Sequence, residues 1–311
     1  MKSQKSQTAN KFFSLFWIFF MIVTDKMREV AEASKHWDIA KVASQFSLPA
    51  ETITRYIRAV KEIRHNAKIL VFDIETQANV GYFWQPYKTS IFLAQMIRPW
   101  YVISWSAKWL HDNEVMSDVL KPAEAKKQND KRICTSLWKL FDEADVLIAH
   151  YGNKFDIPKM NTRFLLQGLG IPSPYQSIDT KHAASKRFAF TYNKLDALGE
   201  ALGIGQKIET DFKLWKDCDN GDAGALDLMS EYNDQDVLLL EEIYLALRPW
   251  IPSHPNMNNY SDTDVCNICG SSELTPKGHY ATLVNKYTTY VCGHCGGFTK
   301  RVRKNLSGLA R

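Results

Sequence analysis

Four cysteines near the C-terminus constrain the fold of the chain most strongly. They form two Cys-x-x-Cys pairs, Cys266 with Cys269 and Cys292 with Cys295, and 22 residues separate the pairs. This spacing is typical of a four-thiolate Zn²⁺ site in which each pair lies in a tight turn. Metal binding can close a small unit that has little hydrophobic core of its own. Residues 251–311 are therefore predicted to form a zinc ribbon with a basic tail, with two disulfides as the alternative.

The composition is that of a globular protein with more than one unit. The chain has 311 residues, 45% hydrophobic and 23% charged, which excludes disorder as the dominant state. Its formal net charge of +5 is unevenly distributed, because residues 1–66 carry 11 basic and 6 acidic side chains, 67–250 carry 21 and 25, and 251–311 carry 7 and 3. A mildly acidic centre between basic ends suits a phosphate-binding protein whose centre needs cations, although ordinary surface variation gives the same pattern.

Residues 12–23 form an apolar run that follows three lysines. The run is shorter than the roughly 20 residues that span a bilayer, but it has the length of a signal-peptide apolar region. Charged residues just before the small-residue triplet at Ala31 and the expected reduced zinc site argue against export. We interpret residues 1–26 as an apolar extension, with translation from Met27 as one explanation, and expect a cytoplasmic protein. Membrane anchoring through the run is the alternative.

Residues 27–66 have the pattern of a helix-turn-helix. Apolar residues recur with helical spacing on both sides of Ser47-Leu48-Pro49, which interrupts the periodicity. The apolar positions are Ile39, Val42, Ala43 and Phe46 in the first segment and Ile53, Tyr56, Ile57 and Val60 in the second. This pattern resembles the DNA-binding helix-turn-helix, whose second helix would expose Arg55 and Arg58 to DNA. A hairpin that only packs on a neighbouring element is the alternative.

Two carboxylates follow an apolar β run at residues 68–72. The run leads into Asp73-Ile74-Glu75, and on a strand Asp73 and Glu75 share a face because side chains alternate. Two carboxylates on one face repel each other unless solvent or a metal ion separates them. The pair therefore predicts either a solvated edge or part of a metal site.

Two further acidic motifs come later in the chain. Asp156 stands at the start of an amphipathic segment that predicts a helix to about Leu166, where it could also be a simple N-terminal cap. Tyr232 and Asp236 are four residues apart in a long helix that is predicted to begin at about Ser230. This spacing places both side chains on one helical face.

The three motifs in this order resemble those of the DEDD superfamily of 3′–5′ exonucleases, in its tyrosine variant. Residues 67–250 are most similar to the stand-alone RNase H-like exonucleases of phages and bacteria. The resemblance implies an α/β fold, an RNase H-like mixed sheet flanked by helices, and a bacterial host cytoplasm if the protein is phage-encoded. Tyr151 departs from the pattern, because polymerase-type members carry Asn at that position.

The resemblance also implies the roles of the site residues. Asp73, Glu75 and Asp236 would bind one divalent ion, and Asp73 would bridge to a second that Asp156 reaches directly or through water. Oxygen ligands suit Mg²⁺ or Mn²⁺, and two such ions lie roughly 3.5–4 Å apart. Tyr232 would orient the attacking water by a hydrogen bond.

Substrate contacts are expected outside the metal site. Residues 181–194 interleave basic and aromatic side chains, which either hold phosphates and stack unpaired bases or belong to the core. The candidate nucleic-acid contacts are Arg55, Arg58, Phe155, Lys186, Arg187 and Lys194. We expect DNA with single-stranded 3′ ends as the substrate and no small-molecule cofactor. The alternatives are RNA or structured nucleic acid at the same site, or a DNA-binding regulator with an inert nuclease core.

Overall fold

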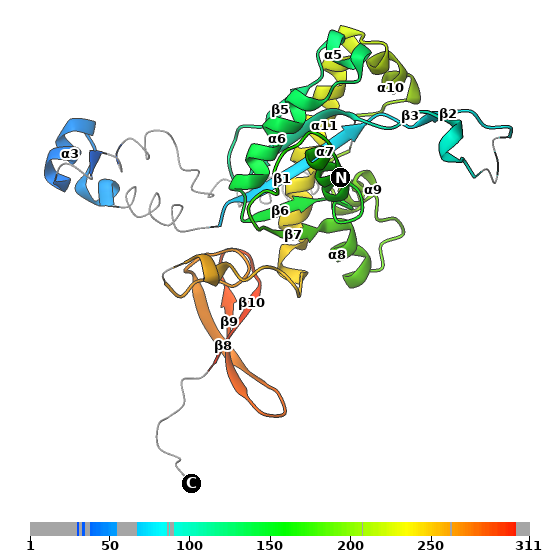
Figure 1. Cartoon of the computed structure of the whole chain (residues 1–311). Coiled ribbons are helices and arrows are strands. Elements are labelled where there is room, and N and C mark those ends of the chain that lie inside the picture. Colours follow the sequence, from blue (N-terminus) through cyan, green and yellow to red (C-terminus); the bar gives the residue numbers. More distant parts are fainter. Residues whose placement is uncertain are drawn as a thin grey trace, which may run out of the picture. The chain divides into compact units, whose positions relative to one another are not determined.

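The computed structural model describes residues 30, 33–34, 38–54, 67–85, 87, 90–206, 208–261 and 263–302. The chain divides into two compact units, Met1–Asn66 and Ala67–Arg311, and each is described by itself (Figure 1). The apolar run at residues 12–23 lies outside the described residues. Among the helices of the described ranges, none is both long and apolar enough to cross a membrane.

The described part of the first unit contains helix α3 (Ile39–Phe46) and a helical segment at residues 50–54. Asp38 caps α3, because its side chain accepts a hydrogen bond of 2.8 Å from the backbone N–H of Lys41. The helix ends at Ser47, which adopts a left-handed conformation with a φ of 51°. A helix, a tight turn and the start of a further helical segment therefore follow one another within residues 39–54.

A small apolar cluster holds this hairpin together. Val42 and Ile53 are fully buried in it together with Val30. Ile39, expected on the same apolar face, is instead exposed, because it is the first residue of α3 and the cluster forms one turn further on. The two predicted DNA contacts of this unit, Arg55 and Arg58, lie outside the described residues.

The second unit is built on a five-stranded mixed sheet with the order β5-β4-β1-β6-β7. The central strand β1 pairs antiparallel with β4 and parallel with β6. The strands are β1 (Ile69–Thr76), β4 (Val102–Trp109), β5 (Met116–Val119), β6 (Val146–Ala149) and β7 (Gln176–Asp179). β1 extends four residues beyond Phe72, so Asp73 and Glu75 lie within the strand.

Helices cover both faces of this sheet (Figure 1). Phe72 of β1 packs edge-on against Phe141 of α6, with ring centroids 4.9 Å apart, and Val71 packs on the opposite face with Leu240 of α11. The helices are α5 (Pro122–Lys127), α6 (Lys131–Glu143), α7 (Asp156–Leu166), α8 (Thr180–Arg187), α9 (Leu195–Leu202), α10 (Phe212–Asp219) and α11 (Ala223–Leu247). The predicted mixed sheet flanked by helices is confirmed.

Helix α11 begins at Ala223, earlier than the predicted start near Ser230. Asp222 caps it by accepting a hydrogen bond of 2.8 Å from the backbone N–H of Ala225. Gly224 in the first turn lowers the helical propensity and hides this start in the sequence. Burial of Leu226 against the core offsets that weakness.

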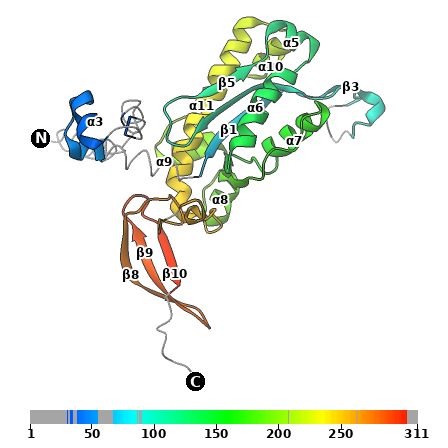
Figure 2. The same ribbon diagram turned by 60° about the vertical axis from the view of Figure 1, so that its left-hand side comes forward.

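A two-stranded arm interrupts the connection between β1 and β4. It consists of β2 (Val80–Gly81), a 3₁₀ turn at Leu93–Gln95 and β3 (Met96–Arg98). Val80 pairs with Arg98, and the two strands form a sheet separate from the main one. Both views show the arm running out beyond the end of β1 (Figures 1 and 2).

The C-terminal part of the second unit is a three-stranded antiparallel sheet with the order β10-β9-β8 (Figure 2). Two short 3₁₀ turns, Arg248–Trp250 and Met257–Tyr260, connect it to α11. Its strands are β8 (Leu274–Ala281), β9 (Lys286–Cys292) and β10 (Phe298–Val302). Met257 packs in the same apolar cluster as the end of α11, which anchors the connection to the core.

Candidate active site

Three carboxylates from two elements gather beside the second half of β1. The ligand oxygens of Asp73, Glu75 and Asp236 all lie within 4.8 Å of one another. Asp73 and Glu75 share a face of β1, and Asp236 comes from α11, where it is buried. Carboxylate oxygens at this spacing fit a divalent cation of the Mg²⁺ or Mn²⁺ kind. The structure thus brings together three of the four carboxylates that the sequence pattern singles out.

The orientation of Asp73 is fixed by a buried amide. Asn233 Nδ2 donates a hydrogen bond of 2.7 Å to Asp73 Oδ2, and Ser104 Oγ donates one of 3.1 Å to Asn233 Oδ1. Asn233 and Ser104 are fully buried. These two hydrogen bonds distinguish the oxygen of the Asn233 amide from its nitrogen, so the NH₂ group is the one that faces the carboxylate of Asp73.

Neither Asn233 nor Ser104 is predicted from the sequence motifs. A signal for Ser104 does exist, because polar Ser104, Ser106 and Lys108 alternate with apolar residues along β4. Such alternation ordinarily indicates a solvated face, but all three side chains are buried here. Helix α11 covers them, with Ser106 Oγ donating a 2.6 Å hydrogen bond to Asp234.

Asp156 lies beside this group but is not one of its three members. It begins α7, is almost completely buried, and accepts a hydrogen bond of 3.4 Å from the backbone N–H of Ile74, the residue between the two β1 carboxylates. Burial raises the pKa of Asp156 to about 7, backbone hydrogen bonds oppose the rise, and the charge of Asp179 adds to it while Lys159 lowers it. A nearby cation would stabilise the charged form of a carboxyl group that is desolvated in this way.

The loop before α7 is held by a second acidic residue. Asp179 accepts backbone hydrogen bonds from Tyr151 at 3.1 Å and from His182 at 3.0 Å, the latter as the cap of α8. Tyr151 has a φ of 66°, and a Cβ on Gly152 would lie 2.4 Å from the side chain of Ala149. Asp179 therefore fixes the strained turn that delivers Asp156, a role that its sequence position alone does not indicate.

His150 stands at the start of the same turn. Its Nδ1 lies 2.9 Å from Thr180 Oγ1, and its Nε2 lies 3.0 Å from the backbone oxygen of Asn193. Both ring nitrogens are engaged within the fold, so the geometry gives His150 a structural position rather than one facing the carboxylates.

Tyr232 stands one helical turn before Asp236 on α11 and is largely buried. Its ring makes an edge contact with Trp215 of α10, with centroids 6.2 Å apart. Trp215 also lines a pocket of about 380 Å³ beside the end of β1, together with Gln77, Trp100 and Lys159. The pocket combines aromatic faces, amides, one cation and the carboxyl group of Asp211, which is a surface that can hold a planar, polar base.

Lys159 connects the pocket to the turn before α7. Its Nζ donates a hydrogen bond of 3.0 Å to Thr76 Oγ1 and lies 4.0 Å from the ring centroid of Trp100 and 4.7 Å from that of Phe155. Phe155, a predicted nucleic-acid contact, is the N-cap residue of α7 and is 38% exposed. Its exposed position next to Asp156 is compatible with substrate contact.

The other predicted contacts lie on α8 and just before α9. Lys186, Arg187 and Lys194 are exposed, and Arg187 Nε donates a hydrogen bond of 3.1 Å to the backbone oxygen of Trp250. Phe188 and Phe190, which could have stacked on bases, pack instead against the apolar core. The contacts described for these three basic residues do not join them to the carboxylate group, and their role stays a prediction.

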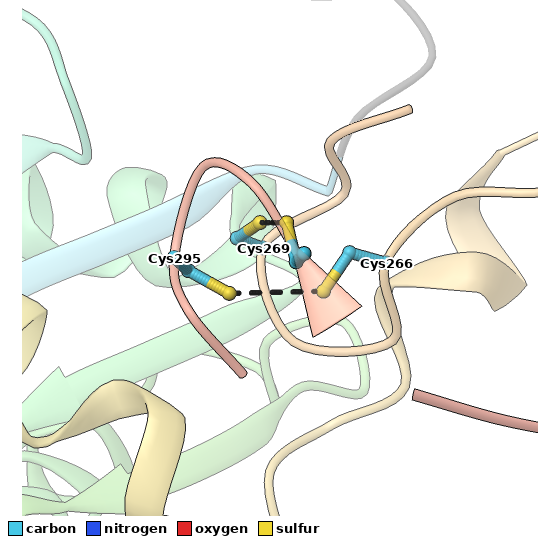
Figure 3. Close-up of side chains that lie close together, drawn as sticks. Cys266, Cys269 and Cys295 are labelled. Carbon is cyan, nitrogen blue, oxygen red and sulfur yellow. Dashed lines mark hydrogen bonds between the residues drawn. The ribbon is translucent and has the colours of Figure 1, made fainter. Parts of the chain in front are cut away.

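The four C-terminal cysteines form a second group that could hold a metal ion. Their sulfur atoms all lie within 4.8 Å of one another, with Cys266 and Cys295 3.7 Å apart and Cys269 and Cys292 3.6 Å apart (Figure 3). Four sulfurs at 2.3 Å from a tetrahedral Zn²⁺ would be about 3.8 Å apart. All six cysteines are free thiols, so the disulfide alternative is not present in this structure. The donor set and its spacing fit zinc.

Cys134 and Cys218 stand apart from this group, and both are buried. Burial is the largest cause that raises the pKa of each thiol, that of Cys218 to about 12. Both side chains therefore belong to the core as neutral thiols.

Residues 101–248 match a family model described as the RNase_H superfamily. The match includes Asp156, Tyr232 and Asp236. Asp73 and Glu75 lie on β1, which precedes the matched residues. The second unit therefore contains an RNase H-like domain, which agrees with the mixed sheet and its flanking helices. No curated protein matches the chain in sequence.

Among solved structures, the family B DNA polymerase from the hyperthermophilic archaeon Pyrobaculum calidifontis is similar to the chain. The similarity covers 71% of this chain and 32% of the polymerase chain, with 15% sequence identity and a TM-score of 0.42. The chain thus spans about a third of the length of that polymerase.

Proposed function

We propose that the protein is a metal-dependent 3′–5′ exonuclease that hydrolyses phosphodiester bonds of DNA at single-stranded 3′ ends. The observation that carries the proposal is the group formed by Asp73, Glu75 and Asp236, with Tyr232 one helical turn away. Carboxylates that converge in this way are the ligands used for divalent ions in phosphodiester hydrolysis. Residues 67–250 form the nuclease domain in this proposal, between a helix-turn-helix at 27–66 and a zinc ribbon at 251–311.

Four carboxylates would supply the ligands for two ions. Asp73, Glu75 and Asp236 would hold one, and Asp73 and Asp156 would hold the other. When bound, such ions activate water and neutralise the charge that develops on the leaving oxygen. Asn233 holds Asp73 in one orientation, which is required of a carboxylate that serves two ligand positions.

The remaining groups act on substrate and water. Tyr232 carries a hydroxyl that would orient the attacking water. The pocket lined by Trp100, Trp215 and Lys159 would hold the terminal nucleotide, with the aromatic faces against the base and the ammonium near its phosphate. The positions of these groups beside the end of β1 support the proposal.

Two modules would add affinity for the polyanion. The exposed basic residues Lys186, Arg187 and Lys194 would contact backbone phosphates, as would Arg55 and Arg58 of the first unit. The four cysteines would hold one structural Zn²⁺, and we propose the cytoplasm as the compartment in which such a thiolate site stays reduced.

The test is a polarity assay on single-stranded DNA and RNA labelled at either end, with Mg²⁺ or Mn²⁺. We expect the 5′-labelled DNA to shorten stepwise from its 3′ end. Asp73→Ala and Asp236→Ala should abolish nucleotide release, whereas Asp234→Ala, a neighbouring acid on α11 outside the cluster, should retain it. Wild-type rates in Asp73→Ala, or degradation from the 5′ end, would overturn the proposal.

A further inference from the structure

The arm between β1 and β4 exposes a run of large aromatic side chains. Trp84 is 97% exposed, Tyr87 81% and Tyr82 74%, and Phe83 and Phe92 are exposed as well. These five rings lie within a stretch of eleven residues, from Tyr82 to Phe92. A soluble surface rarely carries so many adjacent exposed aromatics unless they contact a partner.

The described base of the arm is held by its own backbone hydrogen bonds. Val80 pairs with Arg98 and Gly81 with Met96, and the backbone N–H of Tyr82 donates a bond of 2.9 Å to the oxygen of Gln95.

The sequence of the arm carries no acidic side chain that would repel a polyanionic partner. No Asp or Glu occurs from Gln77 to His111. Arg98 is paired with Asp219 and Lys108 with Glu241, so the stretch offers the absence of negative charge rather than unpaired cations. Aromatic rings without nearby carboxylates are the stacking surface that proteins present to unpaired bases, because every base has a π face and the backbone is anionic. A duplex offers such rings only its edges and phosphates.

The arm also continues directly into the candidate active site. It begins at Val80, shortly after Glu75, and its two ends meet the pocket through Asn79 and Trp100, which both line that pocket. Trp215 lines the same pocket and contacts Tyr232. Trp100 at the base of the arm therefore shares the pocket with Trp215, which in turn contacts the tyrosine one helical turn before Asp236.

We propose that the arm binds an unpaired nucleic-acid strand by base stacking on Tyr82, Trp84 and Phe92 and leads it to the pocket. Strand binding by the arm rests on the proposed nuclease function only for the statement that the strand is led to the pocket. Binding itself requires no hydrolysis, so strand binding and nuclease activity can be tested and can fail separately.

The test compares wild type with the triple variant Tyr82→Ala, Trp84→Ala and Phe92→Ala. The matched control is Leu165→Ala with Ile171→Ala, two exposed apolar residues outside the arm. Binding of a fluorescent oligothymidylate is measured by anisotropy without Mg²⁺ or Mn²⁺, so that the strand is not consumed. We expect the triple variant to bind at least about tenfold more weakly, because each stacked base contributes substantially, and the control to bind as wild type does. The variant Tyr82→Phe, Trp84→Phe and Phe92→Tyr keeps an aromatic ring at each position and should bind as wild type does.

Kinetics provide the second measurement. The triple variant should show a higher KM and an unchanged kcat on single-stranded DNA. It should hydrolyse the p-nitrophenyl ester of thymidine 5′-monophosphate, which is too small to reach the arm, at the wild-type rate. Loss of hydrolysis of the small ester would show that the variant disturbs the site and would overturn the assignment of the arm to strand binding.

Two other outcomes would also overturn this proposal. Unchanged oligonucleotide affinity in the triple variant would exclude strand binding by the arm. A wild-type protein that self-associates in sedimentation velocity, with a monomeric triple variant of unchanged affinity, would make the arm an interface between copies. If wild type binds oligonucleotides through the arm but hydrolyses neither substrate, the proposed function fails while the arm proposal stands.

Discussion

Asn233 donates a 2.7 Å hydrogen bond to Asp73 across the space between α11 and β1, although the two residues are 160 positions apart in the chain. The same amide accepts a hydrogen bond from Ser104 of β4. One buried side chain therefore links the helix that carries Asp236 to the strand that carries Asp73.

Replacing Asn233 should impair the metal site without removing a ligand. Asn233→Ala removes the hydrogen bond to Asp73, and groups that orient metal ligands typically contribute about 10–100-fold to metal affinity or activity. Asn233→Asp keeps the shape but puts a second carboxylate against Asp73, so it should be at least as harmful. Titrating activity with Mn²⁺ measures the effect.

Ser106→Ala is the matched control for Asn233, because Ser106 lies on the same face of β4 and bonds to Asp234, outside the carboxylate group. Its activity and Mn²⁺ dependence should stay close to those of wild type. Wild-type Mn²⁺ dependence in Asn233→Asp would contradict the positioning role.

The stability of the protein without added Mg²⁺ or Mn²⁺ should fall as the pH rises toward neutrality. The pKa of Asp156 is raised by burial to about 7, above its ordinary unfolded value of about 3.9, so the folded state favours the protonated form. That contribution is fully present below the unfolded pKa and is lost as the pH rises through about 7. Asp156→Asn keeps a neutral side chain and should therefore melt higher than wild type at about pH 8, with a smaller difference at about pH 5.

Melting temperatures of Asp156→Asn and of an exposed control, Asp227→Asn, provide the measurement. The Asp156 variant should also lose nuclease activity, since a neutral amide is a weaker ligand for a divalent cation. A stability gain that is the same at both pH values would contradict the burial argument.

A buried ion pair joins β4 to α11 more than one helical turn beyond Asp236. Lys108 and Glu241 are in contact and each side chain is less than a tenth exposed, and Glu241 also accepts a 2.9 Å hydrogen bond from the backbone N–H of His111. Removing one partner should cost about 3–5 kcal/mol, because a buried charge is left without its counterpart. The double variant Lys108→Met with Glu241→Leu should recover most of that loss.

Urea unfolding of the two single variants and the double variant measures the coupling. We expect Glu241→Leu to be more harmful than Lys108→Met, because Glu241 serves two donors. Strictly additive losses in the double variant would show that the pair contributes no mutual stabilisation.

The thiolate group should contain about one Zn²⁺ per chain, and that ion should supply most of the folding free energy of the ribbon. Cys266→Ser and Cys292→Ser should each lose the metal and deprotect residues 263–300 in hydrogen exchange. Cys218→Ala, which removes a buried thiol outside the group, should retain the zinc. Elemental analysis together with the intact mass decides, and a mass with two disulfides and no metal would contradict the assignment.

The basic residues of the predicted DNA-binding helix can be tested separately from the chemistry. Replacing Arg55 and Arg58 by Ala should weaken duplex binding and flatten its dependence on salt, because fewer counterions are released. Cleavage of a short single strand should survive. An unchanged affinity and salt slope would make the hairpin a scaffold.

Local periodicity predicts the parts of the site that lie within one element. Alternation along β1 places Asp73 and Glu75 on one face, and four-residue spacing places Tyr232 next to Asp236. The distance between those pairs depends on the packing of α11 across β1 and β4, which no local pattern contains. Asn233 and Ser104 escape prediction for the same reason, since their contact joins residues 129 positions apart.

The aromatic arm could not be predicted from periodicity either. Its rings have the composition of a buried strand, and only the short pairing of β2 with β3, away from the main sheet, leaves them exposed. Phe188 and Phe190 show the opposite case, since they lie among basic residues that favour a surface and yet pack on the core.

Two hydrogen bonds join the chain segments at the base of the arm, just beyond the paired residues of β1 and β4. The N–H of Gln77 donates a bond of 2.9 Å to the oxygen of Tyr101, and the N–H of Trp100 donates one of 2.9 Å to Asn79 Oδ1. A chain in which a short turn joined Asn79 to Trp100 would keep these bonds and with them the register that positions Asp73 and Glu75. Excising residues 80–99 is therefore expected to leave the strands that carry the carboxylates in register, with loss of the Arg98–Asp219 pair that ties β3 to α10.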